Sequence, residues 1–160
     1  MLHYSFQSRL QTQHLILQDR LYKYPAELLQ NRVDPNKWSV YENFAHLVSY
    51  QPVYLERMQQ ILMQPNPTFK PWSGDTDKNF LEYCHYPLER LLPILMKERE
   101  QVIDLVASLS PSEGERMGTH HVYGSMSLLE WTELFILHES HHIFTMFKLL
   151  HHPNNKLVQQ

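Results

Sequence analysis

Two histidines and a glutamate near the C-terminus form the string HESHH, His138 to His142, which fits the H-E-x-x-H pattern of zinc proteases. In that pattern both histidines bind one metal ion and the glutamate acts as a general base. At about 100° per residue, His138 and His142 share one face of a helix, so both imidazoles can reach one ion. His141 lies close enough to His142 around the helix that spacing alone does not choose between them.

A zinc protease also needs a third ligand after the second histidine, and this chain does not supply one. That ligand is a histidine six residues on, with a glycine three residues before it, or an acidic residue on a later helix. Thr145 and Lys148 stand at the two positions, and no Asp or Glu follows His142. We therefore reject the protease and expect the third ligand upstream.

His46 is the best upstream candidate for the third ligand. It lies beside Tyr50 and Val53 at the edge of the apolar stripe of another predicted helix. Metal sites in helical bundles are built from inward side chains of facing helices. Three histidines would leave at least one position on the metal for water or substrate, as in catalytic zinc sites. A fourth ligand such as His141 or His120 would instead close the site.

Other polar residues near these histidines have simpler alternative roles. Glu139 could be a base beside the metal or part of a solvated helix face. Glu42, one turn before the upstream histidine, is expected to cap its helix. His120 and His121 lie on a predicted connection, where they could line the open side of the site or simply be solvated.

Apolar residues at helical spacing predict four helices that would position these side chains, and no strand. The second and fourth helices open with capping boxes, Ser39 with Glu42 and Ser127 with Glu130. Pro52 is expected to kink the second helix. The aromatic side chains expected in the core are Trp38, Phe44, Trp131 and Phe135. The predicted helices span residues 4–24, 39–63, 78–109 and 127–152. This pattern favours an all-α four-helix bundle.

Composition agrees with one ordered helical domain over residues 1–160, with 42% hydrophobic residues and only four glycines. The net charge of -3 gives no basic surface for nucleic acid. No apolar run approaches the roughly 18 residues of a membrane span, and no signal peptide is evident, so we expect a cytoplasmic protein. Cys84 is the single cysteine, which excludes an intramolecular disulfide and a cysteine-rich zinc site.

Two stretches resemble the DinB-like (damage-inducible) superfamily and occur in the same order as in that family. WSVYENFAHL resembles its W-S-x-x-E-x-x-x-H-L segment, and GTHHVYGSMSLLEW with HESHH resembles its lead-in and H-x-x-x-H helix. The similarity extends from about Trp38 to Leu150. Members are four-helix bundles with three histidines on a divalent metal, so the resemblance implies His46, His138 and His142 as ligands between the second and fourth helices.

The resemblance also implies a class of function. It indicates a metal-dependent enzyme for a small molecule, acting by thiol transfer with a low-molecular-weight thiol or by hydrolysis, with catalytic residues not yet assigned. Zinc or nickel is the expected ion, since imidazole suits both. Relatives are commonly dimers, so a homodimer is expected by similarity. The alternative is a non-catalytic metal-binding or stress-response module, in which the site stabilises the bundle or senses an ion.

Overall fold

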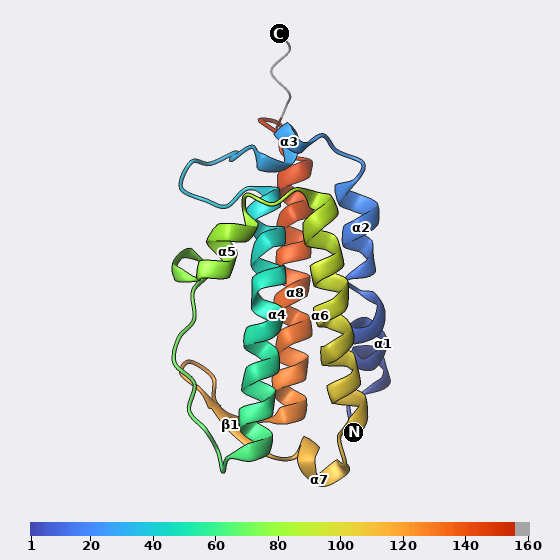
Figure 1. The fold of residues 1–160 in the computed structure, drawn as a ribbon, viewed down its shortest axis with the longest axis vertical. Coiled ribbons are helices and arrows are strands. Elements are labelled where there is room, and N and C mark those ends of the chain that lie inside the picture. The colour runs from blue at the N-terminus through green and yellow to red at the C-terminus, as the bar shows by residue number, and fades with distance from the viewer. Residues whose placement is uncertain (156–160) are drawn as a thin grey trace.

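Long helices lie side by side and form the body of the molecule (Figure 1). The computed structural model describes residues 1–155. Within them α1 and α2 together form the first rod of the bundle, and α4, α6 and α8 form the other three. The all-α four-helix bundle is therefore confirmed. The helices are α1 (Tyr4–Thr12), α2 (Leu15–Leu21), α3 (Ala26–Gln30), α4 (Val40–Met63), the 3-10 turn η1 (Gly74–Thr76), α5 (Lys78–Tyr83), α6 (Leu88–Ser108), α7 (Pro111–Gly114) and α8 (Leu128–Leu150).

Capping boxes begin the two helices that carry the histidines, as the sequence predicts. At α4 the Glu42 carboxylate accepts the Ser39 N–H at 2.7 Å, and the Ser39 hydroxyl accepts the Glu42 N–H at 3.1 Å. Ser127 and Glu130 make the same exchange at the start of α8. Since each box satisfies N–H groups that the first helical turn leaves free, both starting points are well defined.

Two of the predicted helices are interrupted. The first divides into α1 and α2 at Gln13 and His14. The third divides into α5 and α6 because Pro87 has no N–H to continue a helix and instead precedes the first residue of α6. α4 continues through Pro52, and α6 through Pro93.

A short hairpin occupies part of the predicted connection, so the expectation of no strand is wrong. β1 (Met117–His120) and β2 (Gly124–Ser127) pair antiparallel, with His120 opposite Gly124. Gly124 has a φ of 77°, which glycine adopts without steric cost. Strands of four residues are too short for an alternating pattern to be recognised in the sequence.

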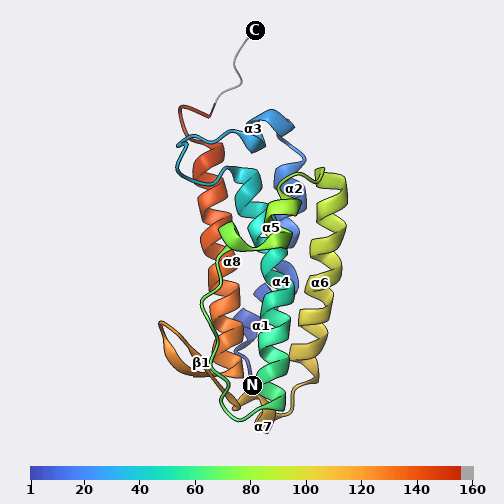
Figure 2. The same ribbon diagram turned by 60° about the vertical axis from the view of Figure 1, so that its left-hand side comes forward.

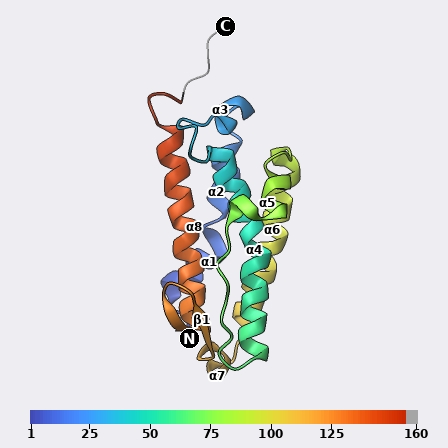
Figure 3. The same cartoon turned by 90° about the vertical axis from the view of Figure 1, so that its left-hand side faces the viewer.

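Residues 64–77, which we call the covering segment, run along α4 and α8 (Figures 2 and 3). Thr68 joins the segment to β1 by a parallel bridge with Thr119. Phe69 packs on Trp131 of α8 with ring centroids 5.2 Å apart. The segment therefore closes the side of the bundle where α4 faces α8.

The buried apolar side chains form two clusters along the bundle. One contains Phe44 and Leu95, and the other contains Tyr54 and Val102. Between them α4 carries buried polar residues, so polar groups are concentrated in the middle of the bundle.

No helix in residues 1–155 combines the length and apolar character needed to cross a membrane.

Candidate metal centre

The three histidines selected from the sequence come together between α4 and α8. His46 lies on α4, and His138 and His142 lie one turn apart on α8. One ring nitrogen of each lies within 4.8 Å of the others, and no other His, Cys, Asp or Glu of residues 1–155 joins the group. His46 is 6% exposed and His142 is 9% exposed. The fold thus builds the predicted triad, whose binding of a metal stays a prediction.

Two of these imidazoles lack the partners that buried polar groups normally have. Nε2 of His46 faces Nε2 of His138 at 3.0 Å. Nδ1 of each ring is buried without a hydrogen-bond partner. Leaving a buried polar atom unpaired costs about 1–3 kcal/mol, so such atoms are rare in stable folds. Converging imidazole nitrogens are a donor set that divalent transition metals accept, and the site fits such an ion.

Asn43 fixes the orientation of the third imidazole. Its amide nitrogen donates to the Ser39 carbonyl at 2.8 Å, which leaves its oxygen facing His142. That oxygen lies 2.8 Å from Nδ1 of His142 and accepts its N–H. Because a neutral imidazole carries one N–H, Nε2 of His142 has a free lone pair. A partner of this kind is common behind metal-ligating histidines.

Burial keeps the three imidazoles neutral at physiological pH. Together with the smaller effect of neighbouring imidazoles, it lowers the pKa of His46, His138 and His142 to about 3. A histidine must be neutral to bind a metal. The rings are therefore in the form that a metal requires.

Aromatic side chains surround the triad. The ring centroid of Trp38 lies 4.8 Å from that of His46, and the centroid of Trp72 lies 5.3 Å from it. Tyr50 packs against His138 at 4.7 Å. Trp38, predicted as a core residue, is half-buried and lines the site. Its indole packs between the α4 histidine and the covering segment, where its N–H donates to Asp75.

The covering segment contacts the site directly. Asp75 accepts the Trp38 indole N–H at 2.9 Å, and Asp77 accepts the Trp72 indole N–H at 3.3 Å. The backbone at Gly74 passes so close that a Cβ there would lie 3.0 Å from Nδ1 of the α4 histidine. The segment thus holds both tryptophans against the imidazoles and limits access of water.

The other reactive residues of the sequence lie outside the triad. His141 is exposed on α8, and neither it nor His120 joins the group of ligand atoms found in residues 1–155. His121 is exposed at the hairpin turn. Burial raises the pKa of the Cys84 thiol to about 11, so the thiol stays protonated. None of these side chains closes the site.

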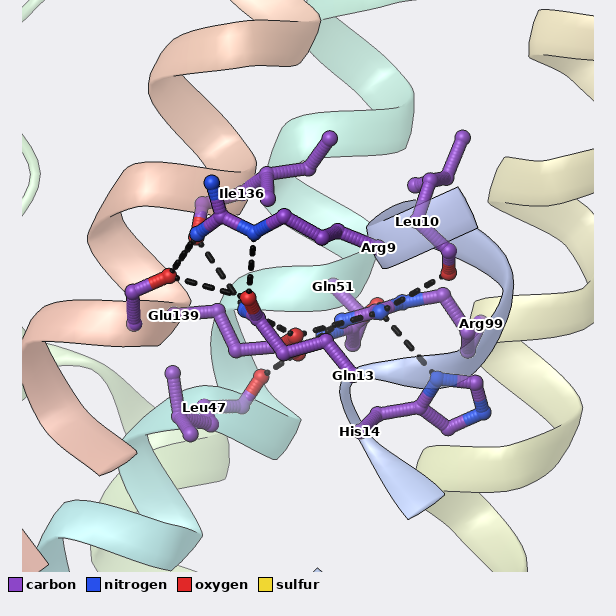
Figure 4. Close-up of polar contacts among 10 residues, drawn as sticks. Arg9, Leu10, Gln13, His14, Leu47, Gln51, Arg99, Ile136 and Glu139 are labelled. Carbon is purple, nitrogen blue, oxygen red and sulfur yellow. Dashed lines mark hydrogen bonds and ion pairs between the residues drawn. The ribbon is translucent and has the colours of Figure 1, made fainter. Parts of the chain in front are cut away.

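Glu139 has neither of the roles considered from the sequence. It is 1% exposed, and both of its oxygens contact the Arg99 guanidinium in a buried ion pair (Figure 4). Its Oε1 also accepts the Gln13 amide N–H at 2.9 Å. Arg99 donates in addition to Gln51 at 3.1 Å and contacts the His14 ring at 3.3 Å. The glutamate of HESHH is therefore structural.

The sequence did contain a signal for this network. Arg99 stands four residues after Leu95 and three before Val102, which puts a charge inside the apolar stripe of its helix. A charge in that position needs a buried partner of opposite sign. Burial and the Arg99 charge together lower the pKa of His14 to about 4, so the network keeps that ring neutral.

The fold and the site together define a four-helix bundle with a candidate three-histidine metal centre between two of its helices. Comparison with protein families agrees with that class. The family model of the DinB superfamily matches residues 9–146, and this chain belongs to that superfamily.

Two similar proteins carry descriptions of activity. A protein of Oceanobacillus iheyensis, named provisionally as a metal-dependent hydrolase, is 28% identical over 109 residues. The match spans 66% of this chain and 61% of that relative. YfiT from Bacillus subtilis, described as a probable metal-dependent hydrolase with an unusual four-helix bundle topology, superposes with a TM-score of 0.79 and 17% identity. That match covers 91% of this chain and 83% of YfiT, and it establishes the shared fold.

Proposed function

We propose that this protein is a metal-dependent enzyme that hydrolyses a small molecule at a site formed by His46, His138 and His142. The observation that carries the proposal is a group of three neutral imidazoles, two buried and one half-buried, without a fourth ligand in residues 1–155. Three ligands leave a coordination position open, which distinguishes catalytic from structural zinc sites. The descriptions of the two relatives support hydrolysis as the reaction class.

The residues around the triad suit this function. A divalent ion, zinc or nickel in first place, would act as a Lewis acid and make water a stronger nucleophile at neutral pH. Asn43 holds one imidazole in the required tautomer. Trp38 and Trp72 shield the site from bulk water. Burial raises the pKa of Tyr50, so its hydroxyl stays protonated and can donate to a substrate. Glu139 is not the base, since its oxygens are already paired.

Metal analysis of the purified protein tests the site. We expect about one divalent ion per chain in the wild type, and loss of it in His46→Ala, His138→Ala and His142→Ala. His141→Ala is the matched control, because this histidine lies beside the triad on the same helix but is exposed. Full metal retention in His46→Ala would reject the three-histidine centre.

Activity assays then test the reaction class. The metal-loaded protein is assayed for hydrolysis of ester, amide and phosphoester substrates, and we expect turnover of at least one class that His138→Ala loses. In parallel, conjugation of an electrophile by low-molecular-weight thiols is measured. Turnover only in the thiol assay would replace hydrolysis by thiol transfer. Metal binding without turnover in either assay would favour the non-catalytic module.

The homodimer expected from the family resemblance stays a prediction.

A further inference from the structure

Arg57 of α4 is a buried cation without an anionic partner. It is 8% exposed, yet no carboxylate of residues 1–155 lies within ion-pair distance of it. One guanidinium nitrogen donates to the Lys70 carbonyl at 3.0 Å, and the other lies 3.4 Å from the Tyr50 hydroxyl. Arg99, the other buried arginine, has Glu139. A buried charge without a partner is costly, so a partner from outside is expected.

The surroundings of Arg57 add no negative charge. The guanidinium lies 5.5 Å from the Phe69 ring and 5.8 Å from the Trp131 ring, contacts that offset only part of its desolvation. The His120 ring packs against the same tryptophan in a tilted arrangement, with ring centroids 5.3 Å apart. Its Nδ1 accepts the Val122 N–H at 3.1 Å, so its Nε2–H is left as a donor. A cation and an imidazole N–H donor thus both lie against the Trp131 ring.

Arg57 is also connected to the histidine triad. His46, Tyr50 and Arg57 are spaced by four and seven residues, which places them in one row along α4. The Tyr50 ring lies 4.7 Å from the His138 ring, and its hydroxyl faces the guanidinium. Trp72 of the covering segment packs on Tyr50 at 5.1 Å. One molecule under the segment could therefore contact both ends of the row.

We propose that Arg57, assisted by Tyr50 and His120, binds an anionic oxygen group, a carboxylate or a phosphate, of the small molecule whose reacting part lies at the triad. The proposal rests on the proposed function and specifies its substrate as an anion. A guanidinium suits this task because two of its N–H groups can donate in parallel to two oxygens of a carboxylate or of a phosphate. In this structure the Lys70 carbonyl accepts the Arg57 N–H that would otherwise donate to the anion.

Few hydrogen bonds hold the part of the covering segment that contains the Lys70 carbonyl. Within residues 1–155, no main-chain hydrogen bond involves residues 70–72. The hydrogen bonds of this stretch are the side-chain bond from Arg57 to Lys70 and the Trp72 indole N–H on Asp77, and the Trp72 ring also packs on His46 and Tyr50. An anion at Arg57 therefore has to replace few interactions.

The test uses two-headed probes titrated into the full chain. Each probe carries a hydroxamate for the metal and, after two to five methylenes, a carboxylate, a phosphonate or a neutral amide. With zinc-loaded wild type, calorimetry should show the anionic probes binding at least about tenfold tighter than the amide, since hydrogen bonds between charged groups are stronger than those to a neutral amide. In Arg57→Gln this preference should disappear, while the affinity for the amide stays unchanged.

Arg116→Gln is the matched control, because that guanidinium also donates to main-chain carbonyls, those of Ile61 and Gln64. It should keep the preference. Equal affinity of anionic and amide probes for the wild type at every length overturns the proposal, as does a preference that persists in Arg57→Gln. If Arg57→Gln does not fold, the wild-type comparison still decides, and Arg57→Lys should weaken the preference.

The same titrations on metal-free protein separate this proposal from the proposed function. The indole N–H signals are followed by NMR, since Trp131 lies beside the guanidinium. If the chain binds no metal but these signals still respond to the carboxylate and not to the amide, the metal centre fails and the anion site stands. No difference between the probes in either form rejects the anion site.

Discussion

Asn43 shows how a single residue determines the chemistry of a neighbour. Its own amide nitrogen is bound by the Ser39 carbonyl, so its oxygen must face His142. That contact selects the His142 tautomer whose free nitrogen points toward the other two imidazoles. The capping region of α4 thereby sets the donor geometry of a residue on α8.

Replacing Asn43 by Leu should lower metal affinity by about 10- to 100-fold, as losses of such partners do. The size is similar, but the acceptor for the His142 N–H is gone. Competition with a chelator of known affinity measures the effect. Asn79→Leu, on the exposed face of α5, is the control. Unchanged affinity in Asn43→Leu would show that the tautomer is set by other means.

Glu98 is a second residue with an unusual environment. Burial raises the pKa of Glu98 to about 7, and its Oε2 has no hydrogen-bond partner. Because the folded pKa exceeds the unfolded one, the fold loses stability as the pH rises from about 4.5 to about 7, and the whole loss is present above pH 7.

Glu98→Gln should therefore raise the free energy of unfolding at pH 8, by on the order of 1–2 kcal/mol, since one pKa unit corresponds to about 1.4 kcal/mol. The gain should be much smaller at pH 5, where the folded carboxyl is protonated. Urea unfolding at both pH values measures it. Glu100→Gln, an exposed site on the same helix, should show no gain. A loss of stability at pH 8 would contradict the interpretation.

At the scale of the element, α8 presents polar groups in two directions. His138 and His142 face α4, whereas Glu139 reaches the Arg99 side chain of α6. Gln13 binds the same carboxylate from the N-terminal rod, so one residue of α8 joins three rods. The ion pair fixes α8 between its neighbours and thereby the position of both histidines.

Breaking this ion pair should be costly. Glu139→Gln leaves Arg99 buried without its counter-charge, and we expect a loss of about 3–5 kcal/mol in unfolding free energy. A double variant, Arg99→Met with Glu139→Leu, should recover much of that loss, because a buried pair is often replaceable by apolar residues. Urea unfolding measures both.

Metal content separates this structural role from a catalytic one. Folded Glu139→Gln should retain its metal, as should Glu133→Gln, which alters a glutamate of the same helix outside any ion pair found in residues 1–155. If Glu139→Gln keeps wild-type stability and loses only turnover, Glu139 is a base after all.

At the scale of the whole molecule, a polar layer crosses the bundle between its two apolar clusters. The histidine triad lies between α4 and α8. The Arg99 network joins α8 to α6 and to the N-terminal rod (Figure 4). Four neutral histidines lie there: His14, His46 and His142 are buried and His138 is half-buried. A protein that holds so many uncharged imidazoles should be sensitive to acid.

The metal-free protein should lose stability as the pH falls from 6.5 to 4. The unfolded histidines bind protons below about pH 6.5, whereas burial holds the folded pKa of the triad near 3 and that of His14 near 4. Each histidine then contributes a slope of up to about 1.4 kcal/mol per pH unit. Glu98 acts in the opposite direction, so urea midpoints are best compared in the Glu98→Gln background. A midpoint that is constant or higher at pH 5 would refute the prediction.

The sequence by itself determined the four rods of the bundle, though not the breaks in two of the predicted helices, and the identity of the three clustered histidines. Helical periodicity and capping boxes are local properties, since they depend on residues three or four positions apart. His138 and His142 are linked by the same local spacing. His46 could be chosen because it lies on the inward edge of its own helix, and the resemblance to the DinB-like family supported it.

Only the tertiary structure decided what each polar residue faces. Glu139 and His138 are neighbours in the chain, but about 100° of helical rotation directs them to different partners. Arg57 is an ordinary helix residue in the sequence, and its unpaired charge appears only when the covering segment and β1 pack over it. Such contacts join residues far apart in the chain, and no local pattern encodes them, because burial and partnership depend on how whole elements pack.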